Sequence, residues 1–382
     1  MDVLIVTSHN RRSLGFYMQA HAMYKILKKM GRTPVFLRLP PSWDDIKYQY
    51  GYYISYKPAQ MTFNMRLDLA YRQYLNNMPL TKSQNRSMQY PVAIICGNEI
   101  LDINSRHLYK APQFFGDNIN ASRIVGYALC CGDSQYDDMV KYSDRMRGLQ
   151  NMSMLSADND HTNQVLTRIC GYSIPTVLNP TLLIEELYEY NIAGDSNFIL
   201  VYGFRFSKNQ IKEIKEFARR TKRILISLDV YNKWCDYSIP TTPHRALGLI
   251  HSADYIVTDT FYGVIFSIIF RKQFVSFATQ KKIANLLSDL GLAERDRCHM
   301  SAMEDVLLEE VNWDAVATKI VERRRHSLNF LQRALNIDTP RAIDEELSQT
   351  RGFAGLKNLP PIHKTRPQTT PAETAARIAA SR

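Results

Sequence analysis

The stretch that decides the fold is residues 254–278, DYIVTDTFYGVIFSIIFRKQFVSFA. One apolar run ends at Asp259, a short turn follows, and a second apolar run of helical length leads to a third run, QFVSFA. Buried parallel strands are nearly continuous in apolar residues, and they alternate with helices along the chain. The stretch therefore predicts a strand, a turn at TFYG, a helix and another strand.

The same alternation recurs along the chain, which indicates an α/β protein with parallel sheets. The runs that predict strands are residues 3–8, 33–39, 91–96, 123–129 and 175–178, followed by 198–204, 223–228, 254–259 and 273–278. The chain has 382 residues, and domains typically hold about 100 to 200 residues. We therefore expect two Rossmann-like domains whose parallel sheets face a cleft. Their predicted ranges are 1–192 and 193–347, the second with closing helices, followed by a disordered basic tail at 348–382.

The net charge of +11 is concentrated towards the end of the sequence. From Arg351 onward, six Lys or Arg oppose one Glu, which accounts for 6 − 1 = +5 of the total. We see no basic helix or aromatic-basic repeat typical of a nucleic-acid module, so nucleic acid is not an expected partner. The moderately basic remainder favours a polyanionic partner such as an acidic glycan, a sugar nucleotide or an anionic membrane face.

The six cysteines are scattered, without a C-x-x-C pair or a His/Cys cluster at zinc spacing. We predict buried thiols, no metal site and a reducing compartment. The opening MDVLIVTSHN does not resemble a secretory signal, and the longest apolar stretch, residues 255–270, is too short and too polar to span a bilayer. These features predict a cytoplasmic protein, with peripheral contact to the inner face of the membrane left open.

Several polar residues follow the predicted strands, where open α/β sheets bind their ligands. The loop HNRRSLG follows the first strand and contains His9 and Asn10, and Arg205 follows the run FILVYGF. Asp259 and Glu99 are the carboxylates best placed for acid or base chemistry. Backbone N–H groups at the TFYG turn are suited to hold a phosphate or a carboxylate.

Segments over residues 3–295 resemble, in order, the polysaccharide pyruvyl transferase family. LIVTSHNRRSLGFYMQA is similar to the family's opening strand and Gly-x-x-x-Gln-Ala helix start, with Gly15 and Gln19 in place. YALCCG, NPTLL and TDTFYGVIFS are similar to the Y-A-x-S-x-G, D-P-T-L and T-D/N-S-F-H-G-x-x-F-S segments. The last is the most specific of these matches, and a closing series that ends in GLAERD follows it.

The departures from the family pattern fall at charged positions. The histidine of F-H-G is Tyr262, and the arginine before the late isoleucine is Lys282. The S-x-R-E segment appears as residues 156–159, SADN, and the acid of D-P-T-L is Asn179. A tyrosine hydroxyl donates a hydrogen bond but is neutral near pH 7, so Tyr262 replaces the geometry of a histidine without its charge.

The resemblance implies transfer of a pyruvyl group from phosphoenolpyruvate to two hydroxyls of a glycan or lipid-linked sugar during envelope or exopolysaccharide synthesis. Phosphoenolpyruvate would be a co-substrate, and no cofactor is expected. The implied catalytic residues are Tyr262, Asp259 and Glu99. The implied substrate-binding residues are His9, Asn10, Gly15, Gln19, Arg205, Thr260, Gly263, Ser267 and Lys282. The residues also leave open a catalytically silent glycan-binding or partner-binding member, and a nucleotide-sugar glycosyltransferase of the same two-domain architecture, known as GT-B-like.

Overall fold

The computed structural model describes residues 2–8, 13–39, 57–82, 88–104, 111–184, 197–297 and 302–336. These residues form two compact units, each with its own sheet and core. Among the described residues, unit 1 contains those within 2–39, 72–184 and 321–336. Unit 2 contains those within 57–71 and 197–320. The predicted boundary at 192/193 and the predicted tail at 348–382 both lie outside the described residues.

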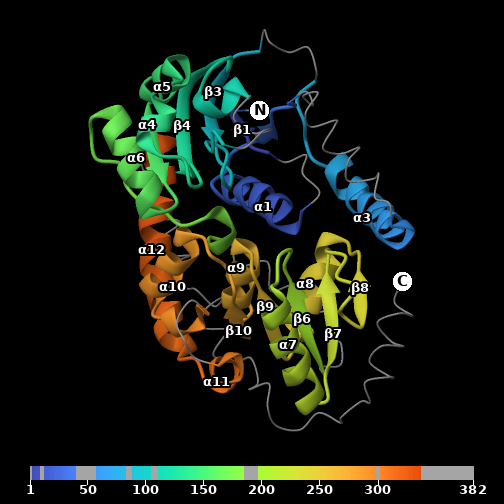
Figure 1. Ribbon diagram of the computed structural model, residues 1–382. Coiled ribbons are helices and arrows are strands. Elements are labelled where there is room, and N and C mark those ends of the chain that lie inside the picture. The colour runs from blue at the N-terminus through green and yellow to red at the C-terminus, as the bar shows by residue number, and fades with distance from the viewer. Residues whose placement is uncertain are drawn as a thin grey trace. The chain divides into compact units, whose positions relative to one another are not determined.

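Unit 1 is built on a parallel sheet of five strands in the order β2-β1-β3-β4-β5 (Figure 1). The strands are β1 (Val3–Val6), β2 (Pro34–Phe36), β3 (Tyr90–Ile95), β4 (Ala121–Leu129) and β5 (Met154–Ala157). Val3 of β1 pairs with Pro34 on one side and Val92 on the other. The strand order reverses between β1 and β3, which is where ligands enter sheets of this type.

Unit 2 repeats the plan with the order β10-β9-β6-β7-β8, also parallel throughout (Figure 1). The strands are β6 (Phe198–Tyr202), β7 (Ile224–Leu228), β8 (Tyr237–Ile239), β9 (Tyr255–Thr258) and β10 (Gln273–Ser276). Tyr202 lies beside Thr258 in the register of β6 and β9. The order reverses between these two strands, so the switch point of unit 2 is the end of β6 and β9.

Helices cover both faces of the unit 2 sheet. Right-handed crossovers place α7 (Lys208–Arg220) on one face, and α8 (Pro243–Ser252) and α9 (Phe261–Ile269) on the other. The core on the α7 face includes Ile199, Phe217 and Val257 and extends to Leu307 of α11 (Met303–Leu308). Residues 261–270 are buried on every side, which explains why this helix has an apolar sequence all round.

Helices also flank the unit 1 sheet, and α4 (Tyr136–Met139), α5 (Ser143–Gln150) and α6 (Asp160–Cys170) lie beside β4 and β5 (Figure 1). Leu149 and Leu166 from these helices pack into a core with Leu129 and Leu155 of the sheet. α1 (Leu14–Lys29) joins β1 to β2, and its contacts include the short helix η2 (Pro180–Leu182).

Two long helices are divided between the units. Most of α3 (Pro58–Asn76) belongs to unit 2, although it precedes β3 of unit 1 in the chain. α12 (Trp313–Ala334) begins in unit 2, and its later turns belong to unit 1. There the Ser327 hydroxyl accepts from the amide of Leu178, and Arg324 donates to the carbonyl of Leu182.

The predicted fold class is confirmed, because both units are α/β with parallel sheets. One predicted strand is wrong: residues 175–178 make only an isolated bridge, Ala157 to Thr176. The apolar runs in the sequence did not predict β5 and β8, which are short, or α3. None of the described helices is long and apolar enough to cross a membrane.

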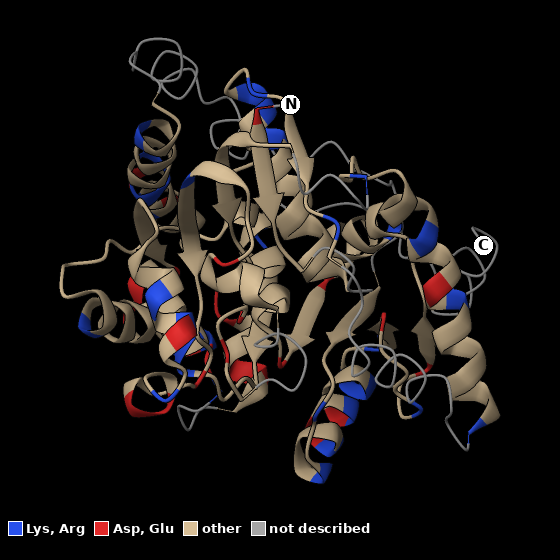
Figure 2. Ribbon diagram, turned by 90° about the horizontal axis from the view of Figure 1, so that it is seen from above, with Lys and Arg blue, Asp and Glu red and all other residues tan. Residues whose placement is uncertain are grey.

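The described surface carries charges of both signs on the same helices (Figure 2). Lys212 pairs with Glu216 on α7, and Arg220 of α7 pairs with Glu304 of α11. Exposed pairs of this kind contribute about 0 to 1 kcal/mol each. The acidic partners offset the positive charge of these lysine and arginine side chains. The outer helices of the described residues therefore carry charges of both signs.

Arg295 is the largest of the fully buried side chains. It donates to the Gln273 side chain at 2.9 Å and to the backbone carbonyls of Val306 and Glu309, so it joins the edge strand β10 to α11. Burial lowers the pKa of this guanidinium. Its hydrogen bonds offset the cost of burying the charge.

We predict that Arg295→Met lowers the free energy of unfolding by about 3 to 5 kcal/mol, because carbonyls that Arg295 satisfies would stay buried without a donor. Urea denaturation followed by circular dichroism measures the change. Arg325→Ala, an exposed arginine of α12, is the control and should shift stability by less than about 0.5 kcal/mol. Equal effects of the two variants would show that Arg295 does not hold α11 in place.

Candidate functional site

The switch point of unit 2 is held together by one carboxylate. Asp259, directly after β9, accepts from the amide of Phe204 at 3.0 and 3.1 Å and from the amide of Arg205 at 2.6 Å. Both donors belong to the loop that follows β6. Burial raises the pKa of Asp259, and the two amides oppose that shift. The carboxylate therefore fixes the β6 loop beside the β9–α9 turn.

The first turn of α9 is pressed against the end of β9. The Thr260 hydroxyl caps the helix by accepting from the amide of Gly263 at 3.0 Å. Thr258 donates from its hydroxyl to the carbonyl of Tyr202 at 2.6 Å and accepts from the amide of Thr260. A Cβ at Gly263 would lie 2.0 Å from the Thr258 hydroxyl oxygen, so only glycine fits there.

Two cationic residues lie at this edge of the sheet. Lys282, in the first turn of α10 (Lys281–Leu290), places its Nζ 4.6 Å from the ring centroid of Phe261, the first residue of α9. Lys282 is buried, whereas its neighbour Lys281 is exposed. Arg205 is exposed on the β6 loop. Together with the α9 N-terminus, these groups make the edge favourable for an anion.

Tyr262 is buried, with 6% of its surface exposed. Its ring stacks on Phe266 with centroids 6.1 Å apart and meets Phe261 edge-on at 5.5 Å. Ser267 is also buried and donates to the carbonyl of Gly263 at 2.7 Å. These contacts give Tyr262 and Ser267 packing and helix-stabilising roles, and the catalytic role of Tyr262 and the substrate-binding role of Ser267 stay predictions.

The loop between β7 and β8 extends the same edge. Asn232 donates from its side chain to the carbonyl of Gly203, at the start of the β6 loop, and to the Ser227 hydroxyl at 3.0 Å. Gly203 is needed here because a Cβ would lie 2.5 Å from an Asp259 oxygen. The three segments that follow β6, β7 and β9 are therefore hydrogen-bonded into one rigid rim.

Asp229, directly after β7, is a buried carboxyl that was not among the residues predicted from the sequence. It accepts from the Tyr71 hydroxyl of α3 at 2.8 Å and from the amide and hydroxyl of Thr241 at 2.9 Å. Burial raises the pKa of Asp229 to about 6, against the effect of these hydrogen bonds. Its φ of 52° is a left-handed conformation, which aspartate tolerates better than most residues. Asp229 thus attaches α3 to the rim of unit 2.

In unit 1 the predicted residues lie at the corresponding edge of the other sheet. Gln19 of α1 is buried, and its side-chain oxygen accepts from the amide of Asn98 at 3.1 Å. Glu99 follows in the loop after β3 with a φ of 55°. Gly15 is buried in the first turn of α1. The structure therefore brings Gln19 into contact with the loop that carries Glu99 at the switch point of unit 1.

The other predicted residues divide by unit. Asp259, Thr260, Tyr262 and Gly263 come together at the β9–α9 turn, and Ser267 lies one helical turn further along α9, where it donates to the carbonyl of Gly263. Arg205 meets them through Asp259, and Lys282 through Phe261. His9 and Asn10 lie outside the described residues. Within the described part of the chain, no group of three or more His, Cys, Asp or Glu is placed to hold a metal ion.

Two positions that depart from the pyruvyl transferase pattern are caps. Asn159 is the N-cap of α6 and accepts from the amide of Thr162, and Asn179 is the N-cap of η2 and accepts from the amide of Thr181. Asparagine and aspartate cap helices about equally well. At Asn179 the exchange of aspartate for asparagine therefore keeps the local geometry while removing a charge.

The sequence carried a signal for Asp229, because the run ISLD places a carboxylate directly after a strand, as IVTD does at Asp259. No local signal marked Tyr71, which reaches unit 2 from a helix far away in the chain. Asn232 lies in a loop whose following strand β8 has only three residues. The position of Asn232 therefore depends on the pairing of β8 with β7, and the pattern of apolar residues does not predict that pairing.

A scan against protein-family models gives no match, and a search of curated proteins gives none either. Solved structures with a similar course of the chain include the UDP-GlcNAc 2-epimerase of Methanocaldococcus jannaschii, with 12% identity, a TM-score of 0.46, and coverage of 85% of this chain and all of that one. The UDP-GlcNAc 2-epimerase of Neisseria meningitidis has 11% identity and a TM-score of 0.44, and covers 94% of this chain and all of its own.

A heptosyltransferase of E. coli with ADP-2-deoxy-2-fluoro heptose has 10% identity and a TM-score of 0.37, and the match covers 72% of this chain and 88% of that one. At these scores and identities, the likenesses assign neither an activity nor a ligand to this chain. A proposal about activity or ligand must therefore rest on the residues at the switch points of this chain.

We predict that Asp259→Ala releases the β6 loop and costs about 1 to 3 kcal/mol, because the amides of Phe204 and Arg205 lose a charged acceptor that is half-buried. Amide hydrogen exchange should become faster at these two residues. Asp259→Asn keeps one acceptor oxygen and should give a smaller change. Unchanged exchange in Asp259→Ala would show that the carboxylate does not hold this loop.

We predict that Asp229 makes unit 2 less stable as the pH rises from 4 to 7. The pKa of this acid is raised from 3.8 to about 6 in the folded chain, so its contribution is fully present below 3.8 and is lost as the pH rises through 6. The loss is on the order of 2 to 3 kcal/mol. Asp229→Asn should remove this part of the pH dependence in thermal unfolding, and Asp305→Asn, at an exposed position, should keep it. An unaltered profile in Asp229→Asn would contradict the assignment.

Proposed function

We propose that this chain is a transferase acting on sugars that binds a phosphorylated donor at the carboxyl edge of the unit 2 sheet. The observation that carries the proposal is the fixed junction of the β6 loop with the β9–α9 turn through Asp259. This junction holds the N-terminus of α9 at the switch point, with Arg205 and Lys282 beside it. Such an arrangement suits a phosphate group.

The junction is rigid, and a rigid junction can stabilise the negative charge that develops on a leaving phosphate during group transfer. The β6 loop, the β9–α9 turn and the loop after β7 are joined by hydrogen bonds from Asp259, Thr258 and Asn232. Donors and dipoles that are already in place do not have to reorganise when a phosphate leaves. A leaving diphosphate or phosphate is the species that this edge would stabilise.

Among phosphorylated donors, we favour a nucleotide-activated sugar. Phosphoenolpyruvate brings two anionic groups close together and needs an acid for its enol carbon. Tyr262 is packed among phenylalanines, and both oxygens of Asp259 accept backbone amides, so these two residues serve the fold of the edge. For a nucleotide-activated sugar, the edge needs only to bind the phosphate and to stabilise it as a leaving group.

Phosphoenolpyruvate is the second candidate donor, because matching segments occur in the order of the pyruvyl transferase family along the chain. On that reading Lys282 and Arg205 would hold the phosphate and the carboxylate, and the acceptor would be a glycan or lipid-linked sugar. A chain that binds either donor without turnover would be a silent member with the binding edge retained.

We predict that UDP-N-acetylglucosamine binds the full chain saturably in isothermal titration calorimetry, and that Lys282→Met weakens binding at least tenfold. A charge-assisted contact of about 1.5 to 3 kcal/mol corresponds to a loss of this size. Lys281→Met is the matched control, since it removes the same charge from the exposed neighbouring position. Arg205→Ala should weaken binding in the same direction.

The same titration with phosphoenolpyruvate separates the donor classes. Binding of phosphoenolpyruvate alone, with the same dependence on Lys282, would replace the nucleotide-activated sugar by the pyruvyl donor. Failure of both donors to bind, in a chain whose melting temperature is normal, would overturn the proposed function. Thermal unfolding of Lys282→Met checks that loss of binding does not reflect loss of the fold.

A further inference from the structure

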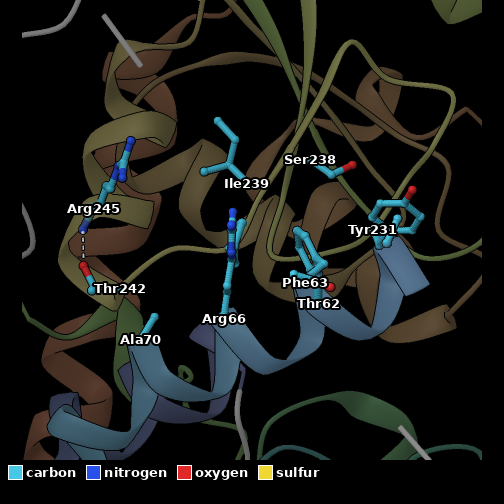
Figure 3. Close-up of a pocket in the computed structure, with 11 residues that line it drawn as sticks. Thr62, Phe63, Arg66, Ala70, Tyr231, Ser238, Ile239, Thr242 and Arg245 are labelled. Atoms are coloured by element: carbon cyan, nitrogen blue, oxygen red, sulfur yellow. Dashed lines mark hydrogen bonds between the residues drawn. The ribbon is translucent and has the colours of Figure 1, made fainter. Parts of the chain in front are cut away.

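A second feature of unit 2 is a pocket of about 630 Å³ between α3 and the start of α8 (Figure 3). It lies at the same carboxyl edge of the sheet, on the side of β7 and β8. Pockets for small molecules commonly enclose about 300 to 1,000 Å³. The residues that line it are Ala59, Thr62, Phe63, Arg66, Ala70, Tyr231, Ser238, Ile239, Pro240, Thr242 and Arg245.

One wall of the pocket is aromatic. Phe63 of α3 and Tyr231 of the β7–β8 loop lie with ring centroids 5.8 Å apart at a tilt of 56°. Phe63 is buried, and Tyr231 is half-buried. Thr62 and Ser238 carry hydroxyls beside these rings (Figure 3). A flat ring stacked on such a wall gains apolar contact.

The rest of the pocket is cationic. Arg66 rises from α3 into the middle of the pocket, and Arg245 lines it from α8 (Figure 3). Thr242 is the N-cap of α8, and its hydroxyl accepts from the amide of Arg245 at 3.4 Å, so the positive end of this helix also faces the pocket. None of the described lining residues is acidic. Two guanidinium groups and the start of α8 therefore line this side of the pocket.

The walls are held in place before any ligand arrives. Ser238 accepts from the amide of Asn232 at 3.0 Å and donates to its carbonyl at 3.1 Å, which fixes the loop that carries Tyr231. The hydrogen bond from Tyr71 to Asp229 anchors α3, the helix that carries Phe63 and Arg66. A pocket with fixed walls loses little conformational freedom on binding.

We propose that this pocket binds a nucleoside diphosphate, with the base on Phe63 and Tyr231 and the inner phosphate on Arg66 and Arg245. The two kinds of wall match the two parts of such a ligand. Guanidinium groups bind phosphate oxygens through paired hydrogen bonds, and the aromatic wall accepts a base. An anion without a ring would leave the aromatic wall unused, and a neutral ring would make no ionic contact with the two guanidinium groups.

This pocket deepens the proposed function and rests on it, because it takes the phosphorylated donor to be a nucleotide. Tyr231 lines the pocket, and the next residue, Asn232, donates to the carbonyl of Gly203 at the start of the β6 loop. The same loop donates to Asp259 through Phe204 and Arg205. A nucleotide in the pocket would therefore direct its outer phosphate and activated group towards the switch point, where Arg205 and Lys282 lie.

The test is isothermal titration of the full chain with UDP, ADP and GDP, alongside uridine and inorganic pyrophosphate. We expect at least one nucleoside diphosphate to bind at least tenfold more tightly than uridine and than pyrophosphate, because each of these fills only one part of the pocket. Arg66→Ala should weaken that binding at least tenfold. Arg219→Ala, an exposed arginine in the last turn of α7, should leave it unchanged.

Arg245→Ala provides a second variant on the opposite wall and should also weaken nucleotide binding. Equal binding of pyrophosphate and nucleotide, or nucleotide binding that both arginine variants leave intact, would overturn the proposal. Nucleotide-sugar binding that depends on Lys282 but on neither arginine would retain the proposed function and reject the pocket. Nucleotide binding that depends on Arg66 but not on Lys282, without any transfer reaction, would retain the pocket and reject the proposed function.

Discussion

The contact between the Asp259 carboxylate and the amides of Phe204 and Arg205 is the constraint on which the site depends. A carboxylate directly after one strand fixes the loop after its neighbour, at the point where the strand order of the sheet reverses. Burial makes this group costly to ionise, and the two amides offset that cost. A fixed β6 loop beside the capped α9 helix is the result, and the loop after β7 is joined to it through Asn232.

Much of the fold was predictable because buried strands and amphipathic helices leave periodic patterns. The run at 254–278 correctly predicts β9, the turn, α9 and β10, since a helix buried on every side differs in length from the strands beside it. Short elements were not predictable in this way. β8 has three residues, too few for a periodic pattern, and its place in the sheet depends on pairing with β7.

The site was predictable in part for a related reason. Asp259 follows β9 directly, and Arg205 lies in the loop that follows β6, so the geometry of the sheet locates both residues. The pocket needs α3, which lies before β3 of unit 1 in the sequence but belongs mainly to unit 2 in space. The sequence of α3 shows that Phe63 and Tyr71 are aromatic, but only tertiary structure shows that they meet Tyr231 and Asp229.

The departures from the pyruvyl transferase pattern acquire a physical meaning from their surroundings. Asn179 preserves a cap, and Tyr262 completes an aromatic cluster with Phe261 and Phe266. Lys282 keeps a cation next to the first residue of α9. Positive charge is thus retained at Lys282, beside the α9 N-terminus, where an anion would bind. Charge is absent at Asn179, which caps a helix, and at Tyr262, which packs against phenylalanines. A phosphorylated donor fits this distribution of charge.

Hydrogen exchange with and without UDP-N-acetylglucosamine, read by mass spectrometry over the whole chain, tests the central claim most directly. If the carboxyl edge of unit 2 holds the donor's phosphates, exchange should slow in peptides that contain residues 203–207 and 260–264. These protected peptides would place the ligand at the β6 loop and the start of α9. Protection confined to unit 1, or no protection at saturating ligand, would contradict the account.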